Sequence, residues 1–173
     1  MKTKTLIFFL FSIISFGQNL EINTWKSKVS DLQVAFNSQW KIMPLFLDTD
    51  DKILIGLKDE SDHSSIVIKI TLDYSKEQLS DEQYFDAVKK QMLKANAENK
   101  LLFEDEIEFK KLKFKRLIFS MKTKFGRLIQ TIYIHRNGKK MTGIQFAYPE
   151  KLKEKSIDKI PTKIEKVLSD LIL

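Results

Sequence analysis

This 173-residue chain contains no cysteine. It can therefore form no disulfide, no thiol nucleophile and no cysteine-ligated metal site, and its stability must come from its core. Only five Gly and three Pro are present, which leaves little material for a flexible linker. The sequence also has no glycine-rich phosphate-binding loop, and this excludes the usual kinds of nucleotide site.

Long apolar runs are missing too. The longest run, Leu6–Phe16, has eleven residues, whereas a membrane-spanning helix needs about 20. Two lysines precede the run, and small residues close it, as in a signal peptide. We therefore expect cleavage between Gly17 and Gln18, which removes residues 1–17 and leaves residues 18–173 as a single exported domain, periplasmic or secreted. A buried N-terminal strand or helix is the alternative, and a lipoprotein is excluded because no cysteine follows the run.

Acidic residues are missing from one long stretch. Residues 109–149 hold eleven Lys or Arg and no Asp or Glu, whereas residues 48–108 hold sixteen acidic and eight basic residues. A basic surface is typical of proteins that meet anionic partners. Because an exported protein rarely meets nucleic acid, we expect a partner of another kind.

Alternating and β-branched runs predict four strands in the first half of the chain. They are Leu32–Phe36, Lys41–Leu47, Lys52–Lys58 and Ser65–Asp73. Pro44 has no backbone donor, so it places the second run at the edge of a sheet. The last two runs are separated by the polar loop DESDHS and are expected to pair as a hairpin.

A helix is expected to begin after Ser80. Ser80 is a favourable N-cap, and Gln83 stands three residues on in capping-box register. Apolar residues then recur at three- and four-residue spacing, at Phe85, Val88, Met92 and Ala95. One face of this helix is therefore expected to pack on the sheet.

Three strands and a second helix are expected in the other half. The strands are Lys113–Met121, Arg127–Arg136 and Lys139–Tyr148. The dipeptide Asn137-Gly138 predicts a two-residue turn that pairs Arg136 with Lys139. Large apolar residues then fall on both faces of this hairpin, so the sheet needs cover on both sides. The C-terminal stripe Ile160, Ile164, Val167, Leu168 and Leu171 predicts a helix that provides the second cover.

These elements predict an α+β fold. We expect an antiparallel sheet of about six to seven strands covered by helices on both faces, which is an α/β/α sandwich. The order of elements resembles the PsbP-like domains, which include the periplasmic DcrB-type proteins. The resemblance lies in VAFNSQW, the capped helix, the meander FKRLIFSM, RLIQTIYIH and MTGIQFAY, and the closing IEKVLSDLIL. It implies a non-catalytic binding or assembly factor and no active-site residues.

Two polar segments are candidates for chemistry. His63, one of two histidines, lies beside Asp59 and Asp62 in the DESDHS loop, so a small hydrolase or metal-dependent enzyme centred there is the alternative function. The stretch Asp48–Asp51 supplies oxygens that calcium prefers, but it lacks the glycine and distal glutamate of an EF-hand. A polar loop and a solvated turn are the simpler interpretations. We expect no catalytic residue, no cofactor and no metal.

The basic block supplies the candidate contact residues. They are Lys122, Lys124, Arg127, Arg136, Lys139 and Lys140. The first three flank one turn and the last three flank the next, so a whole strand separates them. They either contact an anionic component of the envelope or an acidic protein, or they only keep the strands soluble. A third functional possibility is a small apolar ligand held between sheet and helix.

Overall fold

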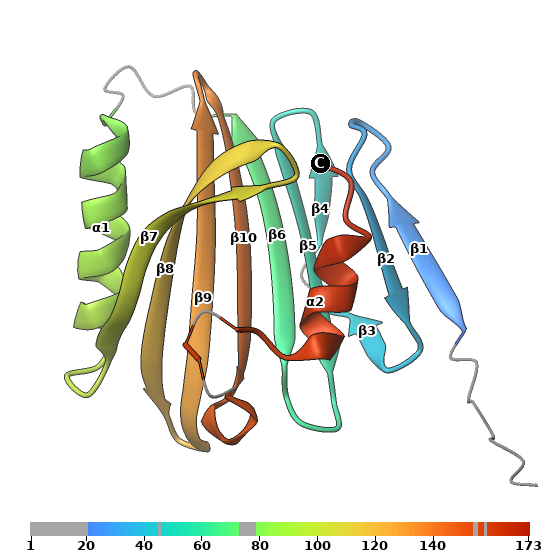
Figure 1. Ribbon diagram of the computed structural model, residues 1–173. Helices are drawn as coiled ribbons and strands as arrows, with labels where there is room; N and C mark the ends of the chain where they lie inside the picture. The colour runs from blue at the N-terminus through green and yellow to red at the C-terminus, as the bar shows by residue number, and fades with distance from the viewer. Residues whose placement is uncertain (1–20, 45, 73–78, 154–155, 158) are drawn as a thin grey trace, which may run out of the picture.

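The computed structural model describes residues 21–44, 46–72, 79–153, 156–157 and 159–173. The expected signal peptide and its cleavage site lie outside the described residues. Within them the elements are β1 (Ile22–Lys26), β2 (Gln33–Asn37), β3 (Trp40–Ile42), β4 (Leu47–Thr49), β5 (Lys52–Asp59), β6 (Ser65–Leu72), α1 (Asp81–Lys94), β7 (Lys100–Phe109), β8 (Leu112–Thr123), β9 (Gly126–Asn137), β10 (Lys140–Pro149), the 3-10 helix η1 (Glu150–Leu152) and α2 (Thr162–Ser169). Figure 1 shows their arrangement.

The main sheet has eight antiparallel strands. Its order is β3-β5-β6-β10-β9-β8-β7, and β4 also pairs with β5 at the first edge. The pairing of β6 with β10 joins the two halves of the chain side by side. The expected strand at 41–47 is split into β3 and β4 around Pro44, and both pieces lie at the sheet edge, as the proline predicted.

Two strands, β1 and β7, were not expected from the sequence. β1 pairs with β2 in a separate two-stranded sheet, and β7 pairs with β8 at the edge of the main sheet. β7 carries alternating acidic residues, and it joins β8 through Lys110 and Lys111, which both have positive φ (53° and 63°). Two-residue hairpin turns with this backbone usually contain Asn or Gly, so nothing in the local sequence predicted a turn at Lys110 and Lys111.

The turn between β9 and β10 also differs. Asn137 pairs with Lys140, so the turn residues are Gly138 and Lys139 and the predicted pairing of Arg136 with Lys139 is wrong. Only Gly138 has positive φ (57°), which is the pattern of a type II′ turn with glycine at the first central position. The turn moves by one residue and each residue's partner by two, for example from Met141 to Gly143 opposite Ile134, so every side chain keeps its face and the expected apolar character of both faces remains.

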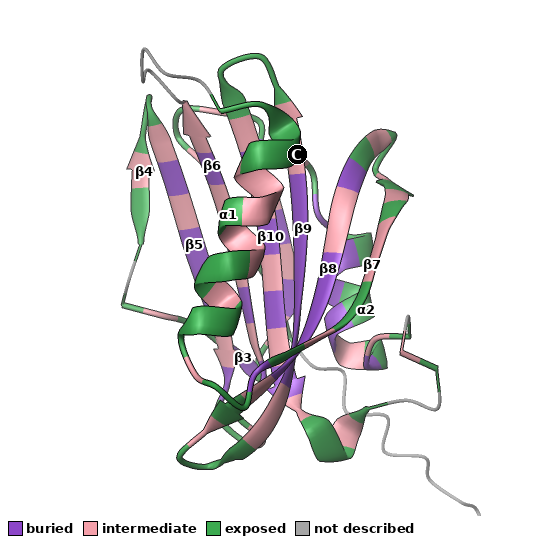
Figure 2. Ribbon diagram, turned by 90° about the vertical axis from the view of Figure 1, so that its left-hand side faces the viewer, coloured by how far each residue is buried: buried purple, intermediate pink, exposed green. Residues whose placement is uncertain are grey.

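Helix α1 begins as expected. Ser80 Oγ accepts a hydrogen bond from the Gln83 backbone, and the Gln83 side chain accepts one from the Ser80 backbone, which is a complete capping box. The helix packs on a small core cluster formed by Leu117, Phe119, Ile132 and Ile134. None of its own residues is fully buried. α1 therefore lies over this face of the sheet with residues that are only partly buried or exposed (Figure 2).

The opposite face carries the larger core. Its buried members come from β5, β6, β8, β9 and β10 together with Val34 of β2 and with Ile164, Val167 and Leu168 of α2. An isolated bridge between Gln33 and Ile172 ties the β1–β2 hairpin to the end of the chain. α2 and the β1–β2 hairpin together cover this face of the sheet (Figure 1).

The expected antiparallel α+β fold is thus confirmed in its coarse form, as a large sheet with two helices. The main sheet has eight strands rather than six to seven, because β7 extends it and the run at 41–47 contributes two short strands. Helices alone do not cover both faces: α1 covers its face only in part, and the hairpin takes much of the other.

Candidate functional site

The six basic candidate residues lie at opposite ends of β9, as their spacing predicted. The two arginines bind other parts of the chain: Arg127 lies 3.2 Å from the Glu98 carboxylate, and Arg136 donates to the Leu79 carbonyl and lies 3.5 Å from Asp81. The lysines Lys122, Lys124, Lys139 and Lys140 are exposed. The structure therefore provides two separate exposed lysine pairs, one at each end of the hairpin, and no single basic pocket.

The His63 loop is organised by a lysine rather than by its histidine. Lys163 of α2 lies 2.7 Å from Asp59 Oδ2 and also bonds Asp62. Burial raises the pKa of both carboxyls, but the hydrogen bonds from Lys163 and from neighbouring serine groups outweigh it, so both pKa values lie below the usual range. His63 is exposed and has positive φ (66°). No described side chain partners its ring, so the loop assembles no catalytic triad.

The acidic stretch Asp48–Asp51 includes the turn between β4 and β5, and its first residue accepts hydrogen bonds from the loop between β1 and β2. Asp48 accepts hydrogen bonds from Ser27 Oγ at 2.6 Å and from the Lys28 backbone at 2.8 Å. Asp51 accepts one from Thr49 at 2.8 Å. In the part of the chain that the structure describes, no group of three or more His, Asp or Glu could hold a metal ion.

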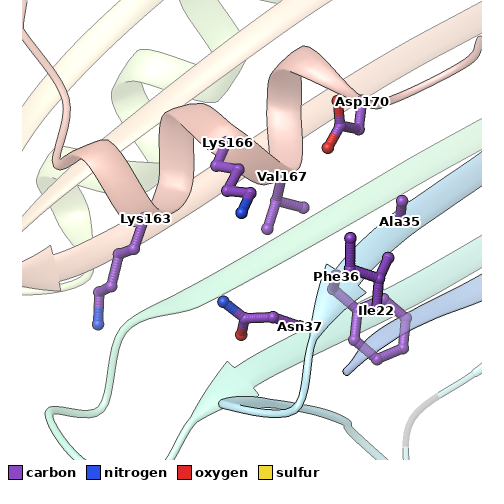
Figure 3. A pocket seen from close by; sticks show the side chains of 8 residues that line it. All are labelled: Ile22, Ala35, Phe36, Asn37, Lys163, Lys166, Val167 and Asp170. Carbon is purple, nitrogen blue, oxygen red and sulfur yellow. The ribbon is translucent and has the colours of Figure 1, made fainter. Parts of the chain in front are cut away.

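Three hollows deserve comparison as ligand sites. The first lies between α2 and the β1–β2 hairpin and is lined by Phe36, Lys163 and Val167 among others (Figure 3). Its volume of about 10 Å³ holds no more than a water molecule. It is therefore a packing gap rather than a ligand site.

The second hollow is a charged crevice of about 410 Å³ between α1 and β7–β8. Lys89 lies 2.8 Å from Asp86 and 3.2 Å from Glu104, and Lys115 lies 3.0 Å from Glu104. The hydrogen bond from Lys115 is the main cause that lowers the pKa of Glu104. Both lysines of the crevice are thus held in ion pairs, and the carboxylates outnumber them, so the crevice presents an acidic ion-pair network rather than a site for an apolar ligand.

The third hollow is a groove of about 240 Å³ between α1 and the centre of the sheet. Its floor is formed by Val67, Lys69, Ile132, Ile134, Met141, Gly143 and Gln145, and its roof by Tyr84, Val88, Gln91 and Met92. Small-molecule sites are mostly apolar, with few polar groups, and measure roughly 300–1,000 Å³. The groove has this lining and lies just below this range, which suits a small ligand.

A glycine leaves part of the groove floor without a side chain. Gly143 stands in the middle of β10, paired with Lys69 on one side and Ile134 on the other. A Cβ added at Gly143 would find its nearest neighbour, the Lys69 carbonyl oxygen, 3.9 Å away, which is ordinary van der Waals contact. The floor is therefore open where a larger side chain would fit.

Sequence reasoning did not find the lining of this groove. A glycine inside a strand pattern is a known mark of close backbone approach or open space, and Gly143 was the one available signal. Lys69 gave none, because a lysine in an alternating strand is normally a solvent-facing residue. The sequence suggested an apolar ligand between sheet and helix as one possibility, but it did not indicate which residues would line the site.

This chain resembles known proteins in its fold rather than in its sequence. No protein-family model matches this chain, and no curated protein sequence does. The solution structure of cyanobacterial PsbP (CyanoP) from Synechocystis sp. PCC 6803 is similar, with a TM-score of 0.61 over 95% of this chain and 98% of that chain. The chain has a PsbP-like fold. The resemblance expected from the order of elements is thereby confirmed.

The similarity to CyanoP comes with low sequence identity. The CyanoP chain is 12% identical to this one. A crystal structure from Bacteroides thetaiotaomicron VPI-5482 is 14% identical, with a TM-score of 0.47 over 86% of this chain and 47% of that chain. Likeness at this level concerns the fold alone, so the function must be argued from this chain's own residues. No helix among the described residues is long and apolar enough to cross a membrane.

Proposed function

We propose that this chain is an exported, non-catalytic binding protein of the bacterial cell envelope, and that it binds its ligand in the groove beneath α1. The observation that carries the proposal is the groove itself: about 240 Å³ of space with an apolar lining, between a helix that has no buried residue and the centre of the sheet. A well-packed interior leaves few such spaces. The PsbP-like fold agrees with a binding role.

The non-catalytic part of the proposal rests on how the polar groups are used. The loop carboxylates Asp59 and Asp62 bond Lys163, and His63 is exposed on a turn. A nucleophile, a base and an oxyanion site must converge for hydrolysis. The described residues bring no such set together. Saturable hydrolysis of an ester, peptide or glycan substrate that His63→Ala abolishes would contradict this part.

Export is proposed from the first 17 residues of the sequence. Expression of the full chain in a bacterium, followed by cell fractionation and mass spectrometry of the N-terminus, tests it directly. We expect mature protein that begins at Gln18 in the periplasm or the medium. Intact protein in the cytoplasm that begins at Met1 would contradict export.

Binding in the groove is tested with a neutral apolar fluorophore such as phenylnaphthylamine. We expect saturable fluorescence enhancement with the wild-type protein and its loss in Gly143→Leu, which fills the floor. Gly143→Ala is the matched control, since one methyl group finds room there. Equal binding by the wild type and by Gly143→Leu, with both proteins folded by circular dichroism, would contradict the groove as the site.

The exposed lysines at the two hairpin ends support a second, separate proposal: contact with an anionic component of the envelope or an acidic protein. Lys122 and Lys124 lie at one end, and Lys139 and Lys140 at the other. Binding to vesicles that contain anionic lipid should weaken in salt and in variants with either pair changed to glutamine. Unchanged binding in both variants would leave the lysines with a solubilising role only.

A further inference from the structure

We infer that the ligand of the groove is a small single-chain amphiphile with an anionic oxygen headgroup, and that Lys69 binds that headgroup. This inference rests on the proposed function and gives it a ligand class. Three independent observations support it: the dimensions of the groove, the charge of its floor, and the distribution of acidic residues around α1.

The length of the groove follows from its lining residues. Along β10 the floor runs from Met141 to Gln145, four steps along the strand or about 13 Å at about 3.3 Å per step. Along α1 the roof runs from Tyr84 to Met92, eight steps along the helix or about 12 Å at about 1.5 Å per step. The two lengths agree. They describe a narrow slot for one short alkyl chain, too small for a folded peptide or a lipid with two chains.

The slot is mostly apolar, with the polar side chains of Tyr84, Gln91 and Gln145 and a single cation. Val67, Ile132, Ile134 and Met141 provide aliphatic and thioether surface. Lys69 is the one charged residue of the lining, it is only partly exposed, and no described carboxylate pairs with it. A partly desolvated ammonium beside an apolar slot favours a ligand that brings its own negative charge.

The strands beside the groove carry no acidic residue on this face. The core isoleucines of β5 and β6 point to the opposite face, so the residues that alternate with them face α1. On β5, β6 and β10 these are Lys52, Leu54, Gly56, Lys58, Ser65, Val67, Lys69, Thr71, Met141, Gly143, Gln145 and Ala147. All are neutral or basic, so the field over the β6 side of the groove is positive.

The acidic residues lie instead on the other side of α1. Asp81, Glu82 and Asp86 line the charged crevice together with Glu104 and Glu106 of β7. The helix thus separates a side rich in carboxylates from one where the described residues of β5, β6 and β10 that face α1 carry none. An anionic headgroup is repelled from the first side and attracted to the second, which places it at Lys69 and the alkyl chain under α1.

The decisive experiment compares ligands that differ only in the headgroup. Decanoate, decyl phosphate, decanol and decylammonium would be titrated against the purified protein in competition with phenylnaphthylamine. We expect both anions to bind at least about tenfold more tightly than decanol, the difference that a charge-assisted hydrogen bond gives. Decylammonium should bind most weakly.

Variants assign the effect to Lys69. Lys69→Met should reduce the affinity for decanoate and decyl phosphate by about tenfold and leave decanol unchanged. Lys94→Met is the matched control: Lys94 is an exposed residue of α1 outside the groove lining, its removal changes the net charge equally, and it should alter neither affinity. Gly143→Leu should abolish binding of every ligand.

Each outcome has a distinct meaning. If decanol and decanoate bind equally and Lys69→Met changes neither, the headgroup inference is wrong while groove binding stands. If neither the neutral probe nor any amphiphile binds, both the headgroup inference and the proposed binding in the groove are wrong. If the protein forms a dimer that Gly143→Leu dissociates and decanoate does not compete with, a second copy fills the groove and the amphiphile is excluded.

Discussion

Replacing Lys163 by methionine should lower the free energy of unfolding by about 3 kcal/mol at neutral pH. Lys163 reaches from α2 to two carboxylates in the loop between β5 and β6, and the Asp59 side chain is only 4% exposed. Methionine keeps the length and apolar stem of the side chain, so packing changes little. The variant therefore leaves a buried carboxylate without its cation.

The magnitude follows from what Asp59 loses and keeps. Removing one partner of a buried ion pair lowers stability by roughly 3–5 kcal/mol. Asp59 keeps two hydrogen bonds from Ser61, at 2.9 Å and 2.6 Å, which places the expected value at the lower end. The contact between Lys163 and Asp62, whose side chains are 22% and 19% exposed, is partly screened by water and adds less than the contact with Asp59.

Urea unfolding followed by tryptophan fluorescence measures the effect. Trp40 is 2% exposed and lies beneath the Lys163 ammonium, 5.5 Å from ring centroid to Nζ, so its emission reports on this region. With a urea dependence of about 2 kcal/mol/M, the midpoint should fall by about 1.5 M. Lys166→Met is the control on the same helix, since Lys166 is exposed, and it should change stability by less than about 0.5 kcal/mol.

The effect should also depend on pH with a definite sign. In the wild type the pKa values of Asp59 and Asp62 are lowered, so their contribution is present above about pH 4 and is lost as pH falls further. In Lys163→Met only the two hydrogen bonds from Ser61 still oppose the effect of burial, so the pKa of Asp59 should lie above its wild-type position. The difference between the two proteins should therefore narrow below about pH 4.

A double variant completes the test. Asp59→Asn together with Lys163→Met removes both charges, so it should be more stable than Lys163→Met alone. A loss below about 1 kcal/mol at neutral pH, or an equal loss at pH 3 and pH 7, would refute the account of Asp59 as a buried carboxylate that depends on Lys163.

Three further changes test the fold by the same urea assay. Ser80→Ala should lower stability by about 1 kcal/mol and speed hydrogen exchange in α1, because the capping box is lost; unchanged exchange would contradict the cap. Gly138→Ala should lower stability by about 1 kcal/mol, since φ is 57° there, whereas Gly143→Ala should stay within about 0.5 kcal/mol of the wild type; equal effects would contradict the turn geometry. Lys111→Gly should raise stability by about 0.5 kcal/mol by relieving a positive φ, and a decrease would contradict that strain.

The elements that the sequence predicted best are those with local signals. The capping box at Ser80 and Gln83 formed as expected, because its donors and acceptors lie within one turn of helix. The alternation of side chains between the two faces of a strand correctly predicted β5, β6, β8, β9 and β10, since core-facing residues recur at every second position in each of them. The two ends of the basic hairpin were also correctly separated by strand length.

The elements that the sequence missed lack such signals. β7 is an edge strand with acidic residues along one face, and its turn uses Lys110 and Lys111 where glycine or asparagine is usual. The prediction misplaced the β9–β10 turn by one residue. Gly138 can be the second central residue of a type I′ turn or the first of a type II′ turn, and the pairing along the whole hairpin decides between the two.

The sequence by itself determined the strand periodicity, the capped helix, the absence of cysteine chemistry and the uneven distribution of charge, because each depends on residue type and local spacing. Only the tertiary structure decided that Lys69, Gly143 and the underside of α1 meet around one groove, and that Lys163 rather than His63 organises the loop carboxylates. The physical reason is the pairing of β6 with β10, which joins segments about 70 residues apart through hydrogen bonds that no local pattern encodes.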